Sequence, residues 1–203
     1  MGASPAERFL ERRKRFDDAI RLEIPDRVPL EINFGYFPAK YCGIPHAASH
    51  YDYDAWLAAC KKTLLDFGAD IGGVQPFFPG SVLELIDPRV IQWPGQNGSM
   101  MQSHQYLDGE YMREDEYDLL ISDPTAFILT RYMPRMSGAM QGFGSIGLLP
   151  AGDMGYRSVL ALAEALATPQ AAATLEVLRR IGREYLEWQP KLAAFSKEIE
   201  DLG

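Results

Sequence analysis

Histidines and cysteines are the residues of this chain best suited to metal or thiol chemistry. His46 and His50 have the i, i+4 spacing that would place two zinc-binding imidazoles on one face of a helix. Pro45 and the lack of a helical period argue against a helix there, which leaves loop histidines near the mouth of a pocket as the open alternative. Cys42 and Cys60 show no paired spacing, and Cys60 is expected to be a small buried hydrophobe. The sequence therefore predicts no metal site within this chain.

Acidic residues gather in the stretch 104–124. Its alternating pattern, interrupted by a turn at Asp108-Gly109 and resumed through Tyr111, predicts a hairpin. The three acids at 114–116 then open a helix, with an apolar docking face formed by Tyr117, Leu120 and Ile121. Paired carboxylates could serve acid and base catalysis. A helix N-terminus, however, stabilises each negative charge by about 0.3 to 1 kcal/mol, and this structural role is the preferred interpretation.

A glycine-rich segment, residues 142–147, reads Gly-Phe-Gly-Ser-Ile-Gly and matches the dinucleotide motif G-x-G-x-x-G letter for letter. That motif requires a preceding strand and a following helix. No strand precedes the segment, and Pro150 interrupts the place where the phosphate-binding helix should begin. The sequence favours an irregular loop over residues 137–156 and argues against a dinucleotide site.

Composition and charge restrict the class of protein. The chain has 203 residues, 47% of them hydrophobic, and 28 acidic residues against 20 basic ones give a formal charge of -8. This charge opposes general attraction to nucleic acid or anionic membranes, so neither is expected as a partner. There is no signal-peptide pattern and no apolar run of the roughly 20 residues that a spanning helix requires. With two cysteines and no disulfide framework, a cytoplasmic protein with reduced thiols is expected.

The order of elements in the first third of the chain is typical of parallel β/α units. Ser4-Pro5-Ala6-Glu7 predicts a capped helix start, and residues 27–34 alternate as a first strand. Residues 35–50 are rich in glycine, proline, tyrosine and histidine and predict a loop. A helix capped by Asp52 or Asp54 and ending at Gly68 follows, and then a second short strand over 70–75. A strand, a helix and a strand in this order predict an α/β fold with a parallel sheet.

Later segments are mostly helical. A possible strand over 90–93 precedes helices predicted from Asp123-Pro124 to about Tyr132, where Pro134 ends the helix, and from 157 to 167. A long helix from Pro169 to about Leu202 should be kinked or divided by Pro190.

Several of these segments together resemble the uroporphyrinogen decarboxylase superfamily, which includes the decarboxylase itself and corrinoid-linked methyltransferases. The resemblance covers most of the chain and depends on the order and spacing of its motifs more than on any one of them. The matching segments are Ile24-Pro25-Asp26-Arg27-Val28-Pro29, Gly68-Ala69-Asp70, Glu110-Tyr111-Met112, Glu116-Tyr117-Asp118, Asp123-Pro124 and Tyr132-Met133-Pro134-Arg135.

The resemblance implies a (β/α)₈ (TIM) barrel, which takes about 250 residues. The expected fold is therefore α/β, a partial TIM barrel with an N-terminal helix that ends before the barrel is complete. We expect residues 1–203 to form the N-terminal portion of a uroporphyrinogen decarboxylase-like domain, either as part of a longer protein or as a subunit completed by a complementary C-terminal half.

Within the superfamily, the residues present disfavour decarboxylation of uroporphyrinogen, a polyanion. The true decarboxylases carry arginines after the first strand and an aspartate after the second. Residues 31–38 contain no arginine, and residues 75–79 contain no aspartate. The loss of so many charge-assisted contacts should weaken polyanion binding by several kcal/mol.

The resemblance favours methyl transfer linked to a corrinoid, such as demethylation of a small methylated compound, once the missing half is present. It implies a corrinoid protein as partner and a zinc ion held by residues outside this chain; no cofactor is assignable to the chain itself. The alternatives are uroporphyrinogen decarboxylase of porphyrin biosynthesis and a noncatalytic binding or assembly subunit.

Candidate site residues follow from the rule that barrel enzymes carry out chemistry at the carboxyl ends of their strands. This rule selects Asn33 and Tyr36 after the first strand and Gln75 after the second as substrate-binding candidates. His104 is a further candidate, although it is expected in a hairpin outside the barrel. For each candidate, satisfaction of local backbone groups is the alternative role. No catalytic residue is assigned.

Overall fold

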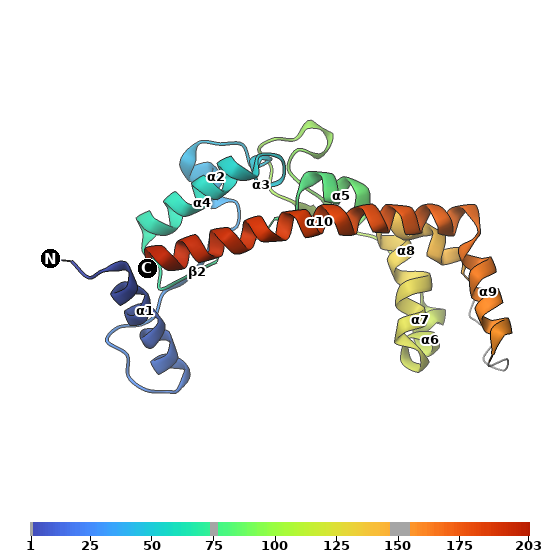
Figure 1. Ribbon diagram of the computed structural model, residues 1–203, viewed down its shortest axis with the longest axis horizontal. Helices are drawn as coiled ribbons and strands as arrows, with labels where there is room; N and C mark the ends of the chain where they lie inside the picture. The colour runs from blue at the N-terminus through green and yellow to red at the C-terminus, as the bar shows by residue number, and fades with distance from the viewer. Residues whose placement is uncertain (1, 74–76, 147–154) are drawn as a thin grey trace. The chain divides into compact units, whose positions relative to one another are not determined.

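The computed structural model describes residues 2–73, 77–146 and 155–203. This part of the chain is mostly helical, with a few short strands (Figure 1). It divides into two compact units, one formed by residues 1–79, 94–103 and 186–203 and the other by residues 80–93 and 104–185. Helix α10, Pro169–Leu202, contributes to both.

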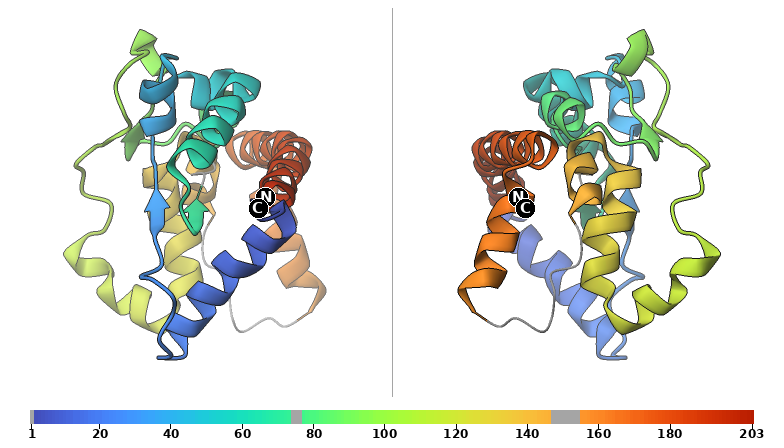
Figure 2. Two further views of the ribbon diagram at one scale, coloured as in Figure 1. Left: turned by 90° about the vertical axis from the view of Figure 1, so that its left-hand side faces the viewer. Right: turned by 90° about the vertical axis from the view of Figure 1, so that its right-hand side faces the viewer.

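The first unit contains a pair of parallel strands, β1 (Glu31–Asn33) and β2 (Ile71–Gly73), with Ile32 opposite Gly72. The left view of Figure 2 shows them side by side. Between them the chain forms α2 (Phe37–Cys42), α3 (Ala48–Tyr51) and α4 (Tyr53–Phe67). The parallel order predicted from the sequence is confirmed, although both strands are shorter than predicted.

Residues 35–50, predicted to be a loop, contain two short helices. Pro38 lies in the first turn of α2, where the missing N–H of proline is not needed. Gly43 ends that helix in the left-handed conformation, with φ +73°. The proline and glycine that suggested a loop therefore mark the two ends of a helix.

Helix α4 begins and ends where the sequence predicted. The Asp52 side chain accepts a hydrogen bond from the Ala55 N–H at 3.1 Å, and Gly68 closes the helix with φ +59°. Its buried face places Trp56 and Cys60 in a core with Phe77 and with Phe195 of α10. The side of α4 that faces the sheet packs tightly, because a Cβ at Gly72 would lie 2.2 Å from the Leu64 side chain.

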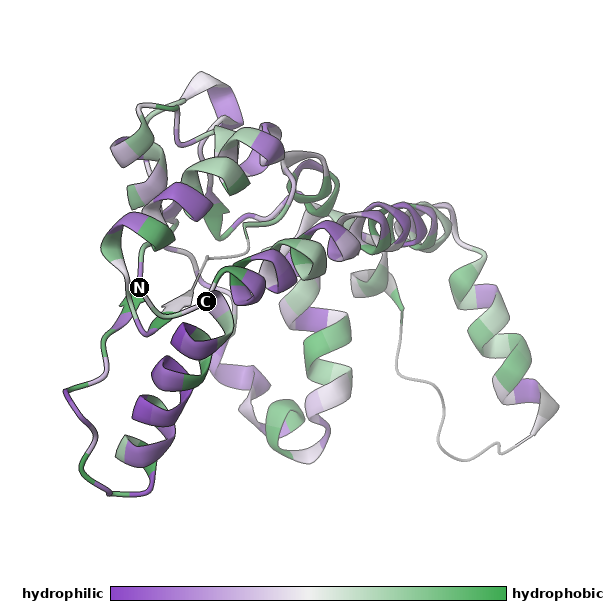
Figure 3. Cartoon of the chain, turned by 60° about the vertical axis from the view of Figure 1, so that its left-hand side comes forward, coloured by the Kyte–Doolittle hydropathy of each residue, from purple (hydrophilic) through white to green (hydrophobic). Residues whose placement is uncertain are grey.

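Helix α1, Pro5–Ile20, has the predicted capping box. Ser4 Oγ accepts from the Glu7 N–H, and the Glu7 carboxylate accepts from the Ser4 N–H at 2.7 Å. The helix ends at Ile20, earlier than the Pro25 boundary expected. Figure 3 shows it as mostly hydrophilic.

The second unit contains α5 (Gly80–Ile86) and an antiparallel pair formed by β3 (Ile91–Gln92) and β4 (Gln105–Tyr106). The predicted hairpin around Asp108-Gly109 is wrong, since β4 pairs with the earlier segment and not with the residues after the turn. The Tyr111 side chain folds back instead, and its hydroxyl donates to the Leu107 carbonyl at 3.2 Å.

A nearly continuous helical segment follows, made of η2 (Glu114–Glu116), α6 (Tyr117–Ser122), α7 (Pro124–Phe127), the π-helical η3 (Ile128–Tyr132) and α8 (Met133–Met136). Asp123 caps α7 as predicted, accepting from the Ala126 N–H at 2.9 Å. Pro134 does not end the helix. The wider π turn before it accommodates a ring that would collide with the Thr130 carbonyl in a regular α-helix.

The predicted docking face of α6 is wrong in part. Tyr117 and Ile121 are exposed, Ile121 at 77%, and none of the residues of α6 is buried. The buried side chains in this region lie on either side of α6, at Glu116 before the helix and at Phe127 after it. These flanking residues therefore anchor the helix.

The remaining elements are the 3-10 segment η4 (Gly138–Ser145), α9 (Tyr156–Leu166) and α10. The glycine-rich motif lies largely in η4, while its last glycine is outside the described residues. Gly142 packs against α10, with its N–H donating to Thr174 Oγ1 at 3.1 Å. Helix α10 continues through Pro190 as one element, so the proline does not divide it.

The partial TIM barrel expected from the resemblance is not seen in the part of the chain that the structure describes. Within the described ranges the named strands form two sheets of two strands each, and only β1 and β2 pair in parallel, so the fold is mixed α/β at most. None of the helices described here is long and apolar enough to cross a membrane.

Candidate functional site

Tyr36 is the centre of an aromatic cluster in the first unit. It precedes α2, just beyond the carboxyl end of β1, and its side chain is buried. Its ring stacks on Phe77, with centroids 4.2 Å apart, and on His46 at 5.2 Å. The ring of Trp56, from α4, also belongs to the cluster, with its centroid 5.5 Å from that of Phe77. The Tyr36 side chain is therefore fixed by stacking against aromatic rings from several segments.

His50 is held by hydrogen bonds at both ring nitrogens. Nδ1 lies 2.8 Å from the Phe78 carbonyl oxygen, and Nε2 lies 3.1 Å from the Tyr36 hydroxyl. Since a carbonyl oxygen can only accept, Nδ1 carries a hydrogen, and when the ring is neutral Nε2 accepts from the Tyr36 O–H. The tautomer and the plane of the ring are both set by these partners.

The Tyr36–His50 pair has the geometry of an oriented acid and base. A hydroxyl within hydrogen-bond reach of an imidazole whose other nitrogen is fixed can pass or hold a proton. Both side chains are less than a tenth exposed. The pair therefore also serves as an internal link, joining the segment after β1 to α3 and to the segment after β2.

The other predicted site residues fall in different places. Asn33 Oδ1 accepts from the Gly35 N–H at 3.2 Å, across a turn in which Gly35 has φ +50°. This contact is the local backbone role that was its alternative. Gln75 lies outside the described residues. His104 belongs to the second unit, where its ring contacts Tyr106 edge to face at 5.4 Å, so the cluster of the first unit is built without it.

The described residues do not offer a zinc site. They contain no group of three or more His, Cys, Asp or Glu side chains that could hold a metal ion. The two nitrogens of His50 are already engaged, and burial raises the pKa of the Cys60 thiol to about 12, which disfavours the thiolate that a metal binds. The two cysteines are free, as expected.

An ion-pair network that the sequence reasoning missed fixes the opposite end of the strands. The Asp70 carboxylate, at the start of β2, has a fully buried side chain and accepts from the Leu30 N–H, Arg27 and Arg15. Burial alone would raise the pKa of Asp70, but these hydrogen bonds outweigh it and lower the pKa. Arg15 also binds Asp26, and the hydrogen bond from Arg15 is the main reason that the pKa of Asp26 falls to about 2.

A second missed ion pair lies in the other unit. Arg135 donates to both carboxylate oxygens of Glu116, at 2.5 and 2.6 Å, and Glu116 also accepts from the Arg113 N–H. The hydrogen bonds from Arg135 are the main cause that lowers the pKa of Glu116 to about 2. Glu116 therefore acts mainly as the partner of Arg135, while Glu114 and Asp115 are exposed at the helix start as expected.

A signal for the first network was available. Arg27 precedes β1 and Asp70 precedes β2, and the starts of adjacent parallel strands lie at the same edge of a sheet.

Comparisons of the chain with protein families, with curated proteins and with solved structures give no significant match.

Proposed function

We propose that this chain is the N-terminal part of a (β/α) barrel enzyme of the uroporphyrinogen decarboxylase type. When it is completed by a complementary C-terminal half, it takes part in methyl transfer between a corrinoid protein and a small-molecule acceptor. The methyl group would pass to or from the corrinoid of the partner protein, as in demethylation of a small methylated compound. With a thiol as the acceptor, the corrinoid would keep the electrons of the methyl bond that breaks, while the new bond to sulfur forms and the thiol proton passes to solvent. Of the residues of this chain, the proposal involves mainly those that follow β1 and β2.

The observation that supports an enzyme is the oriented Tyr36–His50 pair beyond the carboxyl ends of two parallel strands. In α/β and barrel enzymes, ligands bind at this edge of the sheet. The Phe78 carbonyl fixes the His50 ring, and His50 in turn fixes the Tyr36 hydroxyl. A tyrosine held in this way can position a polar group of a substrate once the site is complete.

The placement of the arginines favours methyl transfer over decarboxylation of a polyanion. Arg15 and Arg27 are bound to Asp70 at the start of β2, which is the edge opposite to Tyr36. Guanidinium groups committed to a buried carboxylate are poorly placed to bind several substrate carboxylates. The cluster around Tyr36 is aromatic, as suits a small and largely apolar substrate.

Zinc, when bound, would activate the thiol acceptor as a Lewis acid. The described residues do not fit a zinc site, so the proposal places the ligands in the complementary half. The parallel pair β1 and β2 also supports a complementary half, because two parallel strands are seldom stable without further strands beside them.

The test is methyl exchange between methylcobalamin and a thiol, followed by the visible absorption of the corrinoid. The protein is purified alone and together with the polypeptide encoded beside it. Zinc and exchange should appear only in the assembled form, and Tyr36→Phe should slow exchange at least several-fold. Tyr106→Phe, at a side chain that is 79% exposed, is the matched control and should have no effect.

The outcomes separate the alternatives. An assembled protein without zinc and without exchange would rule out methyl transfer. Exchange that is equally fast in the Tyr36→Phe variant would leave the reaction intact but remove Tyr36 from it. A stable assembly with an unrelated neighbour and no activity would favour a noncatalytic subunit.

A further inference from the structure

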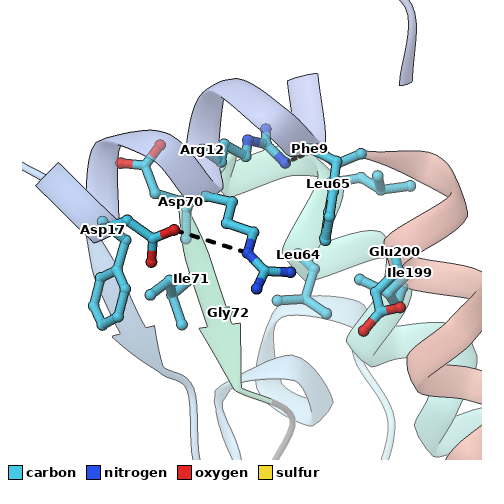
Figure 4. A pocket seen from close by; sticks show the side chains of 14 residues that line it. Phe9, Arg12, Asp17, Leu64, Leu65, Asp70, Ile71, Gly72, Ile199 and Glu200 are labelled. Atoms are coloured by element: carbon cyan, nitrogen blue, oxygen red, sulfur yellow. Dashed lines mark hydrogen bonds and ion pairs between the residues drawn. The ribbon is translucent and has the colours of Figure 1, made fainter. Parts of the chain in front are cut away.

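The first unit contains a cavity of about 380 Å³, bounded by α1, α4, the start of β2 and the last turn of α10. Figure 4 shows it from close by, with Phe9, Leu64 and Ile71 among the side chains that line it. Its walls are largely apolar, formed by Phe9, Phe16, Leu64, Leu65, Ile71 and Ile199. A volume of this size lies within the range of about 300 to 1,000 Å³ that is usual for small-molecule sites.

This cavity is distinct from the Tyr36 cluster. Ile71 is the first residue of β2, whereas Tyr36 follows the last residue of β1. Because the two strands are parallel, the start of one and the end of the other lie at opposite ends of the pair. A ligand in the cavity would therefore not occupy the site proposed for methyl transfer.

Two arginines of α1 supply the positive charge around the cavity. Arg12 is held in place by its hydrogen bond to the main-chain oxygen of Gly203. Arg13 has a side chain that is 68% exposed and lies 3.9 Å from Asp17, a distance at which an exposed ion pair contributes little. Arg13 can therefore exchange this contact for a ligand at little cost.

The acids around the cavity limit the ligand charge. Asp70 is already satisfied by Arg15, Arg27 and the Leu30 N–H. Asp17 and Glu200 also line the cavity and would repel a second negative charge. A single carboxylate matches the planar fork of a guanidinium, whereas a dianionic phosphate would meet this repulsion.

We propose that the cavity binds a small amphipathic monocarboxylate, with its hydrocarbon body against the apolar walls and its carboxylate on Arg13. The binding site belongs to this chain and does not depend on the proposed methyl transfer. Its occupant would join α1 to the sheet and to the end of α10.

The experiment measures binding of octanoate, 1-octanol and octylamine to the protein by titration calorimetry at pH 7. Octanoate should bind saturably with one site and at least about fivefold more tightly than octanol, with octylamine the weakest. Arg13→Gln should weaken octanoate at least about fivefold and leave octanol unchanged. Arg179→Gln is the matched control, because Arg179 is also 68% exposed and pairs with an acid on its own helix.

A second variant tests the cavity itself. Leu65→Trp places a larger side chain at the lining without removing charge, and it should abolish binding of both octanoate and octanol while circular dichroism stays unchanged. The proposal is overturned if octanoate does not bind saturably, or if octanol or octylamine binds as tightly as octanoate. It is overturned equally if Arg13→Gln and Arg179→Gln have the same effect, or if Leu65→Trp folds and still binds octanoate normally.

Discussion

Arg27 donates two hydrogen bonds to the carboxylate of Asp70, from Nη1 to Oδ2 and from Nη2 to Oδ1, each 2.6 Å long. The same carboxylate accepts from the Leu30 N–H at 2.8 Å. Since Leu30 immediately precedes β1 and Asp70 immediately precedes β2, these bonds set the positions of the two strand starts. Arg15 extends the network to α1.

Asp70→Asn should destabilise the first unit strongly. The amide keeps the shape of the side chain but leaves two guanidinium groups without their buried anion. Breaking a buried pair in this way costs about 3 to 5 kcal/mol, and because Arg27 is about half exposed the lower end is expected. Urea unfolding followed by circular dichroism measures the loss.

Asp66→Asn is the control for that measurement. Asp66 pairs with Lys62 and with the Tyr41 hydroxyl, but its side chain is partly exposed on the surface of α4. Only a small change in the free energy of unfolding is expected. Equal losses in the two variants would show that the buried network does not stabilise the unit.

Acid should destabilise the second unit through Glu116. Arg135 lowers the pKa of Glu116 from its ordinary 4.5 to about 2, so the folded state favours the carboxylate. This contribution is complete above the pKa of the unfolded chain and is lost as the pH falls through the folded pKa, that is, between about pH 5 and pH 2. The urea midpoint should fall over this range, and less steeply in Glu116→Gln. Glu114→Gln, which removes an exposed acid from the same turn, should retain the full dependence.

Tyr36→Phe should keep the cluster and remove one hydrogen bond of His50. The phenyl ring preserves stacking on Phe77 and His46, while loss of the hydroxyl removes the hydrogen bond to Nε2, at a cost of about 1 kcal/mol. Nitrogen NMR of the wild-type protein should show His50 with its hydrogen on Nδ1. The opposite tautomer would contradict the assigned direction of both hydrogen bonds.

The elements that local chemistry determines could be predicted from the sequence. The capping box at Ser4, the N-cap at Asp52 and the helix end at Gly68 each depend on a few adjacent residues, and all three are present. The parallel order of β1 and β2 followed from the helix between them. These signals need no knowledge of tertiary contacts.

Partners distant in the sequence could not be predicted as easily. The strand at 105–106 pairs with residues 91–92 and not with the residues after the turn at Asp108-Gly109. Glu116 forms an ion pair with Arg135, in addition to any interaction with the helix dipole. Tyr36 was predicted as a site residue from its place after β1. His50, its hydrogen-bond partner, was considered as a metal ligand or as a loop histidine near the mouth of a pocket, and the pairing with Tyr36 was not predicted. Which of several possible residues pairs with a given strand or charged side chain depends on tertiary packing, and the pattern of adjacent residues does not show that packing.

Two glycines of the second unit provide a matched test of backbone packing. At Gly142 a Cβ would lie 2.2 Å from the Gln170 carbonyl oxygen and 2.6 Å from Thr174 Oγ1, whereas at Gly182, within α10, it would meet nothing within 4 Å. Gly142→Ala should therefore destabilise by about 1 to 3 kcal/mol, because η4 must move away from α10. Gly182→Ala should stabilise by about 0.5 to 1 kcal/mol, because alanine favours the helix. Thermal unfolding of the two variants measures both, and a stabilised Gly142→Ala variant would show that η4 does not pack on α10 as described.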